Sequence, residues 1–379
     1  MSCSSSSASE DDEDFDSYRK GGYHAVRVGD SFASGRFIAQ RKLGWGQFST
    51  VWLAYDTQTS KYVALKIQKS APEFVQAALH EIEILSALTE NDPKNEKCVV
   101  QLVDHFKHRG PNGQHLCMVL EFLGDSILHL IRYNRYKGLN LYKVREVCKC
   151  ILIGLDYIHR ELRIIHTDLK PENILLMSTV NPSKDPIRSN TAPILERPEG
   201  SLAGGGAVNV IEKKLKQRAR RAVAKIAAER RGMIGGCAPE VKPERCLDGI
   251  DFRCKIVDLG NACWAKPGPG FSEDEDHLAL MMELLGKMPK KIATGGGRSK
   301  DYFDRHGDLK RIRRLKHSSL SRLLIDKFKY SETDAREFAE FLNPILDFDP
   351  EKRPTAQQCL QHPWLCQTAA KTAAEKSNS

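Results

Sequence analysis

The chain has 379 residues, of which 41% are hydrophobic and 28% are charged, and its formal net charge is +9. This composition supplies enough apolar side chains for one large globular domain or two modest ones, and it excludes a wholly disordered chain. No stretch of 18 apolar residues occurs, so we expect neither a membrane-spanning helix nor a membrane partner.

The net charge is unevenly distributed. Residues 1–16 hold six acids and no base, whereas residues 212–231 hold nine bases and two acids. A basic stretch of this kind can contact nucleic acid or acidic partners, or it can be the solvated face of a helix. Because no RNA-binding aromatic motif accompanies the bases, we do not expect direct nucleic-acid binding. Contacts with regulatory partners through this stretch stay open.

The first half of the chain changes from strand-like to helical patterns. Residues 1–35 are rich in Ser, Gly and acids and are predicted to form a disordered arm. Runs of β-branched and aromatic residues at 36–68 predict three consecutive antiparallel strands. A helix is predicted to begin at Pro72, and residues 98–123 contain two further strand candidates. From Ser126 onward the apolar period is helical, so a strand-rich part precedes a helical part.

Residues 177–251 interrupt this order with Pro, Ser, Gly and basic residues. A loop of this length inside a compact domain is typical of an inserted spacer, which we predict to be disordered except for a basic helix at 211–231. Strand character resumes after the spacer. Helical patterns then follow at 276–286, 318–328, 332–346 and 355–361.

A glycine-rich run from Leu43 to Val51 lies between the first two predicted strands. Gly44 and Gly46 would let the backbone approach a ligand phosphate closely, although the same pair also suits an ordinary hairpin turn. Lys66 lies inside an apolar strand and therefore needs a partner, which Glu81 on the following helix can supply. A purely structural ion pair is the alternative interpretation.

The sequence from His166 to Leu176 places a carboxylate, a cation and an amide on one loop between a helix and a strand: Asp168, Lys170 and Asn173. A second carboxylate, Asp258, ends a later strand. Carboxylate and amide oxygens are suitable ligands for Mg²⁺. Each of these residues alone could belong to a turn, but their joint occurrence in this order is improbable by chance.

Together these motifs resemble those of eukaryotic protein kinases from about Arg36 to Leu365, with the spacer excluded. Within the kinases, the chain is similar to the SR protein kinases, which phosphorylate serines in Arg/Ser-rich splicing factors and thereby regulate mRNA splicing. The shared features are the runs HTDLKPEN, DLGNACW and DEDHLALMMELLGKMP and the long spacer. The resemblance implies an α+β bilobed fold with an antiparallel β N-lobe and a mainly helical C-lobe, and a cytoplasmic and nuclear location.

The resemblance also implies domain boundaries. The N-lobe and hinge would occupy 36–123, and the C-lobe 124–176 and 252–366. Residues 177–251 would be the spacer, and 367–379 a disordered tail.

Residue roles follow from the same resemblance, with ATP and Mg²⁺ as cofactors. Asp168 would orient the substrate hydroxyl and accept its proton, and Lys170 would neutralise the transferring phosphoryl group. Asn173 and Asp258 would hold Mg²⁺. The ATP-binding residues would be Leu43, Gly44, Gly46, Val51, Lys66, Glu81, Glu121 and Leu123.

The resemblance further implies that Asp276 and Glu283 dock the Arg-rich stretch of SR splicing proteins. They lie seven residues apart, so both carboxylates fall on one helix face. The alternative is a solvated acidic start of a helix.

Three positions depart from the general kinase pattern. Ser49 replaces the third glycine of the phosphate loop, and Leu259 replaces the Phe of D-F-G. Thr167 replaces the Arg of H-R-D, which implies activity without a phosphorylated activation segment.

The larger departure follows Trp264, where a kinase would carry an activation segment ending in A-P-E and then a buried helix. The run AKPGPGFSEDE is all that lies between Trp264 and Asp276, and no Ala-Pro-Glu follows Asp258; this tripeptide occurs earlier, at 71–73 and, inside the spacer, at 238–240. Arg353, which resembles the usual partner of the A-P-E glutamate, must reach solvent or another acid. We therefore expect an incomplete C-lobe. Two hypotheses remain open: an active serine/threonine kinase, or a catalytically impaired form that binds nucleotide or SR substrates without phosphate transfer.

Overall fold

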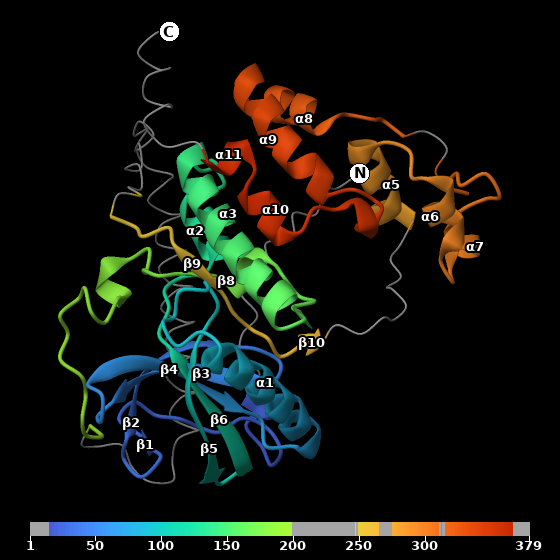
Figure 1. Ribbon diagram of the computed structural model, residues 1–379. Coiled ribbons are helices and arrows are strands. Elements are labelled where there is room, and N and C mark those ends of the chain that lie inside the picture. The colour runs from blue at the N-terminus through green and yellow to red at the C-terminus, as the bar shows by residue number, and fades with distance from the viewer. Residues whose placement is uncertain are drawn as a thin grey trace, which may run out of the picture. The chain divides into compact units, whose positions relative to one another are not determined.

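The computed structural model describes residues 15–198, 247, 249–264, 275–310, 312 and 315–366 (Figure 1). They belong to two compact units. The first lies within residues 1–78, 103–122 and 180–250, and the second within residues 79–102, 123–179 and 251–379. Of the helices in these described ranges, none has the length and apolar character needed to cross a membrane.

A six-stranded sheet in the order β1-β2-β3-β4-β6-β5 forms the first unit. Its strands are β1 (Ser31–Phe32), β2 (Phe37–Trp45), β3 (Ser49–Asp56), β4 (Lys61–Gln68), β5 (Leu102–Gly110) and β6 (Gly113–Glu121). The pairs β2–β3, β3–β4 and β4–β6 are antiparallel. The three consecutive strands predicted at 36–68 are therefore confirmed.

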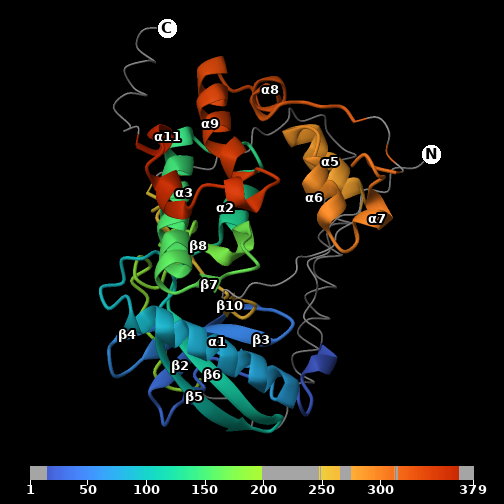
Figure 2. The same cartoon turned by 45° about the vertical axis from the view of Figure 1, so that its right-hand side comes forward.

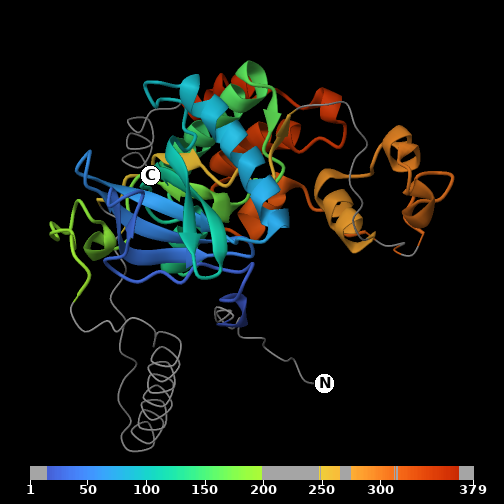
Figure 3. The same ribbon diagram turned by 90° about the horizontal axis from the view of Figure 1, so that it is seen from below.

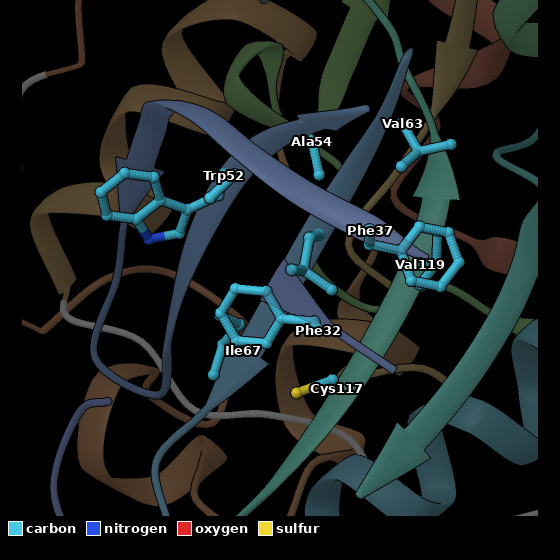
Figure 4. Packing of buried hydrophobic residues seen from close by; sticks show 10 residues of the cluster. Phe32, Phe37, Trp52, Ala54, Val63, Ile67, Cys117 and Val119 are labelled. Carbon is cyan, nitrogen blue, oxygen red and sulfur yellow. The ribbon is translucent and has the colours of Figure 1, made fainter. Parts of the chain in front are cut away.

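Burial alternates along β4 because successive side chains of a strand point to opposite faces. Val63, Leu65 and Ile67 are buried, whereas Lys66 is half-buried between two of them. The buried face packs with aromatic side chains that include Phe37 (Figure 4). The cluster comprises Phe32, Phe37, Ala39, Trp52, Ala54, Val63, Leu65, Ile67, Cys117 and Val119. The alternation therefore sets Lys66 on the face opposite this core.

The N-terminal arm differs from its prediction. Composition predicts disorder over residues 1–35, but from Phe15 onward the arm has a defined conformation that begins with the 3-10 helix η1 (Phe15–Ser17). Tyr23 and Phe32 are 4% and 2% exposed. The Gly21 amide donates to the Asn112 carbonyl at 3.0 Å. Average composition hides these few aromatic side chains, whose burial holds the arm on the sheet.

The first part of the predicted spacer also has structure. It contains the 3-10 helix η4 (Pro182–Lys184), and residues 182–198 lie beside the strands of the first unit (Figure 3). The Gln40 amide nitrogen donates to the Ile194 carbonyl, and the Ile194 amide donates back to the Gln40 side chain, both at 2.8 Å. The helix predicted at 211–231 and the tail at 367–379 lie outside the described residues.

The second unit is mainly helical. Its helices are α2 (Ile127–Tyr133), α3 (Leu141–Asp156), α5 (Glu275–Leu285), α6 (Lys290–Gly295), α7 (Ser299–Tyr302), α8 (Leu320–Asp326), α9 (Glu332–Ile345), α10 (Ala356–Leu360) and α11 (Pro363–Cys366). The helix α1 (Pro72–Glu90) contributes residues to both units. Side-chain caps explain several helix starts: Ser331 begins α9 by accepting from the Asp334 amide. The four helical patterns predicted after the spacer are confirmed as α5, α8, α9 and α10.

Short elements complete this unit. They are the π-helix η2 (Tyr157–Glu161), the 3-10 helices η3 (Pro171–Asn173) and η5 (Pro350–Lys352), and the strands β7 (Ile164–Ile165), β8 (Ile174–Leu176), β9 (Cys254–Ile256) and β10 (Cys263–Trp264). The pairs β8–β9 and β7–β10 are antiparallel. One strand candidate, at 98–106, begins later than predicted. Val99 and Val100 leave the six-stranded sheet and pair with Ile256 instead.

Aromatic stacking joins α11 to α9. Trp364 stacks on Phe338 and Phe341 with ring centroids 4.7 and 4.8 Å apart. Both α10 and α11 contact α3, as Figure 2 shows. A separate cluster, which includes Met282, Ala293 and Phe303, joins α5, α6 and α7. The segment that resembles the kinase C-terminal helices is therefore packed into the second unit.

Candidate active site

The glycine-rich loop joins β2 to β3 in the first unit. Its tip is closed by a backbone hydrogen bond from the Gly46 amide to the Ser49 carbonyl at 2.9 Å. A Cβ atom added at Gly44 or Gly46 would meet no atom within 4 Å. Contacts within the protein therefore do not require glycine at these two positions. Glycine would instead let the backbone come close to a ligand, which a side chain would prevent.

The other predicted nucleotide contacts of the first unit lie on neighbouring strands. Lys66 pairs with Val51 on β3 and with Met118 on β6. Glu121 ends β6 opposite Val63. Leu43 is 40% exposed. The sheet thus presents a row of predicted ATP-binding residues along β2, β3, β4 and β6.

Leu123 and Glu81, the two predicted ATP-binding residues that lie in the second unit, are both buried. Glu81 lies on α1, and its Oε2 atom is 3.4 Å from the position that a Cβ would take at Gly260. A glycine in the D-L-G sequence therefore leaves room for this carboxylate. Nearby, His80 on the same helix shares a 2.9 Å hydrogen bond with the Ala262 carbonyl. The helix and the segment after Asp258 thus support one another.

Gly124, directly after the predicted hinge, packs closely on the strand β8 region. Its amide donates to the Leu176 carbonyl at 2.7 Å. A Cβ added to Gly124 would lie 2.0 Å from the Ser178 carbonyl oxygen. Only glycine fits this position without movement of the backbone.

The loop that carries Asp168 contains a compact polar cluster. The Lys170 ammonium donates to Asp168 Oδ2 at 2.7 Å. The Asn173 amide nitrogen donates to the Asp168 carbonyl at 3.0 Å and to Oδ2 at 3.2 Å. Sequence analysis predicted that these three residues belong together, and the structure brings them into contact.

These hydrogen bonds stabilise the charged forms of Asp168 and Lys170. The hydrogen bond from Lys170 lowers the pKa of the Asp168 carboxyl, with a further contribution from the positive charge. The same bond raises the pKa of Lys170. Asp168 is therefore an anion and Lys170 a cation at neutral pH, as orientation of a hydroxyl and neutralisation of a phosphate require.

His166 fixes the start of the loop. Its side chain is buried, its Nε2 atom is 2.9 Å from the Val257 carbonyl, and its Nδ1 atom accepts from the Asp168 amide at 3.3 Å. An accepting Nδ1 requires the tautomer with hydrogen on Nε2. The imidazole thus connects the loop to the segment that carries Asp258.

Thr167 plays a part that sequence analysis missed. Its φ is 67°, a conformation that β-branched residues rarely adopt, and its hydroxyl donates to the Asn261 carbonyl at 2.9 Å. The residue that replaces the usual arginine therefore ties the Asp168 loop to the D-L-G-N loop. No local signal could have found a partner 94 residues away.

The two predicted Mg²⁺ ligands lie on adjacent segments. The Val257 amide donates to the Asn173 carbonyl at 3.0 Å, and Asp258 follows directly with a φ of 62°. Because the Asn173 amide nitrogen faces Asp168, its amide oxygen is directed elsewhere. This pairing of an amide oxygen with a carboxylate fits a hard divalent cation.

The predicted docking residues lie on α5. Asp276 is in the first turn of this helix, and its side chain lies outside the described part of the structure. Glu283 accepts from the Lys316 amide at 2.9 Å, and its own carbonyl accepts from the Ser318 amide. Glu283 thus fixes the segment after α7, and its role in substrate docking stays a prediction.

Arg353 lacks the glutamate that usually pairs with it, and of the two outcomes expected from the sequence, solvent or another acid, it reaches solvent. Its side chain is exposed, and its Nε donates to the Asp347 carbonyl at 2.7 Å. Solvent and a backbone oxygen therefore stabilise the charge without a second acid.

Comparison with known proteins places these features in context. The model of the protein kinase domain matches residues 37–184. The serine/threonine-protein kinase SRPK of Physarum polycephalum is 37% identical, over 94% of this chain and 91% of its own. Protein kinase dsk1 of Schizosaccharomyces pombe is 32% identical, over 95% of this chain and 86% of its own. SRSF protein kinase 3 of Homo sapiens is 30% identical, over 94% and 90%.

A solved structure supports the fold independently. The crystal structure of a kinase domain superposes with a TM-score of 0.62 at 22% identity and covers 90% of this chain and 98% of its own. This likeness confirms the predicted α+β fold with an antiparallel β N-lobe and a helical C-lobe.

Proposed function

This chain belongs to the SRPK family of serine/threonine protein kinases, and we propose that it phosphorylates serines in Arg/Ser-rich splicing proteins with ATP and Mg²⁺. The observation that carries the proposal is the contact of Asp168 with Lys170 and Asn173. By this proposal the chain regulates mRNA splicing and acts in the cytoplasm and the nucleus.

By this proposal each residue of the polar cluster has a role in transfer. The Asp168 carboxylate would accept a hydrogen bond from the substrate serine hydroxyl and receive its proton as the serine oxygen bonds to the γ-phosphorus of ATP and the bond from that phosphorus to the leaving ADP oxygen breaks. Because its pKa is lowered, this carboxylate is a weak base, so its main contribution is orientation. Lys170 neutralises charge on the transferring group, and Asn173 holds the Asp168 side chain in place.

The cofactor residues fit this chemistry. Asn173 and Asp258 would hold Mg²⁺ through their oxygens, and Lys66 would hold the nucleotide phosphates. ATP with Mg²⁺ supplies the phosphoryl group and the neutralising charge. Asp276 and Glu283 would attract the arginines of the substrate.

Transfer of labelled phosphate to an Arg/Ser-repeat peptide tests the proposal. The full chain should label the peptide, and Asp168→Ala should lower the rate by at least about a hundredfold. A peptide with alanine in place of serine is the substrate control. If wild-type transfer does not exceed that of Asp168→Ala, the proposed activity is refuted.

A second candidate function has one specific observation in its favour. Ten residues separate Trp264 from Glu275, at the position where kinases carry an activation segment and a core helix. A chain that binds nucleotide or Arg/Ser-rich proteins without transfer would be consistent with this short connection. Binding of both ligands at micromolar concentration, with no transfer, is the result that would establish it.

A further inference from the structure

The N-terminal arm contacts the glycine-rich loop directly. The Tyr23 hydroxyl donates to the Gly46 carbonyl at 2.5 Å, although the two residues are 23 positions apart. Tyr23 is only 4% exposed, so this hydroxyl is held away from bulk water. The arm was expected to be disordered, and no role in nucleotide binding was assigned to it.

The side chains at the tip of this loop are largely exposed. Apart from the glycine and its two chain neighbours, the described residues place no atom within 4 Å of a Cβ built at Gly44 or Gly46, and the Trp45 and Phe48 side chains are 48% and 45% exposed. Glycine has the greatest backbone freedom of any residue. With its amide bound to Ser49 and its carbonyl bound to Tyr23, the Gly46 residue is fixed on both sides.

Tyr23 itself is well anchored. Its amide donates to the Ser17 carbonyl at 2.9 Å, and the Asn112 side chain donates to its carbonyl at 2.6 Å. The Lys69 ammonium lies 4.4 Å from the centre of its ring. Because the Lys69 amide also donates to the Phe48 carbonyl at 2.9 Å, Lys69, directly after β4, connects the anchor to the loop.

We propose that Tyr23 is a positioning residue for nucleotide binding, which holds the glycine-rich loop in the conformation that receives the ATP phosphates. The inference rests on the proposed function, because it takes this loop as the phosphate-binding element. By this inference the N-terminal arm has a function: the Tyr23 hydroxyl, which lies outside the kinase core in sequence, fixes the peptide group at Gly46.

Tyr23→Phe is the test, since it removes the hydroxyl and keeps the ring that packs on Lys69. The matched control is Tyr18→Phe. The Tyr18 hydroxyl accepts from Lys42 at 3.1 Å, and its ring lies 5.4 Å from that of Tyr23. Both variants lose one hydroxyl from the same arm, but only Tyr23→Phe loses a bond to the loop backbone.

Equilibrium titration of the full chain with Mg-ATP and with adenosine gives the readout and needs no phosphate transfer. Tyr23→Phe should weaken ATP binding about 5-fold, the factor that corresponds to one hydrogen bond of about 1 kcal/mol. Adenosine has no phosphates, so its affinity should not change. Tyr18→Phe should bind both ligands as wild type does.

The outcomes separate this inference from the proposed activity. Unchanged ATP affinity in Tyr23→Phe refutes the positioning role, as does an equal loss for ATP and adenosine, which would indicate a general structural effect. If the wild-type chain binds ATP but transfers no phosphate, the proposed activity is refuted. The ATP titration of Tyr23→Phe then still tests the positioning role. Failure of wild type to bind ATP would overturn both.

Discussion

Three histidines of the N-lobe are predicted to make its stability depend on pH. The His24 ring centre lies 4.6 Å from that of His108 and 5.0 Å from that of His115. His24 is 8% exposed, and His115 is fully buried. His115 Nδ1 is 2.8 Å from the Gln68 carbonyl, and Phe32 packs on both His24 and His108. A positive charge within this cluster would have little access to water.

Burial and the two neighbouring histidines lower the pKa of His24 from 6.5 to about 4. Burial is also the main cause that lowers the pKa values of His108 and His115, while Asp30 partly opposes the effect at His108. The unfolded chain binds protons below its pKa of 6.5, whereas folded His24 stays neutral. The free energy of unfolding is therefore not reduced by His24 above about pH 6.5, and it decreases as the pH falls from there toward 4.

The size of the effect follows from the pKa of His24. With a pKa of 6.5 in the unfolded chain and about 4 in the folded protein, this residue alone removes about 1 kcal/mol between pH 6.5 and 5.5, and about 3 kcal/mol in all by pH 4. We expect His24→Phe, which keeps an aromatic ring and removes the titrating group, to lose that part of the pH dependence. His105→Gln, at an exposed position of β5, should keep it.

Urea denaturation at pH 7.5, 6.5 and 5.5, followed by the fluorescence of Trp45 and Trp52 in the N-lobe, measures these differences. The quantity compared is the change in the free energy of unfolding between pH 6.5 and 5.5. An equal change in wild type and His24→Phe would refute the reasoning, because protonation of His24 would then cost nothing in the folded state.

Substitutions at two further positions test the C-lobe. Gly124→Ala should prevent stable folding of this lobe or destabilise it by about 3 kcal/mol, because its Cβ would lie 2.0 Å from the Ser178 carbonyl. Circular dichroism during heating measures this loss, and a melting temperature equal to that of wild type would contradict it. Thr167→Val should cost about 1 kcal/mol through loss of its hydroxyl bond, whereas Thr167→Ser should cost less. Equal urea midpoints for these two variants would contradict the assigned hydrogen bond.

Local patterns were sufficient to predict most of the fold. Burial alternates along β4 and follows a 3.6-residue period along α9, because only some side chains of each element face a core. Both patterns can be recognised in the sequence. The Asp168 cluster was also predictable, because Asp168, Lys170 and Asn173 lie within six residues on one loop. At such short separation, the loop itself brings the side chains together.

The remaining features depend on partners distant in the sequence. The Thr167 hydroxyl binds Asn261, and Gln40 binds Ile194, yet neither pair has a local pattern that identifies it. The order of the arm depends on the burial of a few aromatic side chains, such as Tyr23, within a stretch of otherwise polar composition. The average composition of the arm does not reveal these few aromatic residues. It therefore predicts disorder in a segment that contacts with the sheet hold in a defined conformation.

The outer strand of the N-lobe sheet has a consequence for solubility. Among the described strands, β5 stands at the end of the sheet order, with β6 as its one neighbour. Its exposed side chains include His105, Lys107 and Arg109. An unpaired strand edge can template aggregation with a second copy of the same sheet, and long cationic side chains oppose that approach. The basic charges of β5 thus protect the lobe from edge-to-edge association at high concentration.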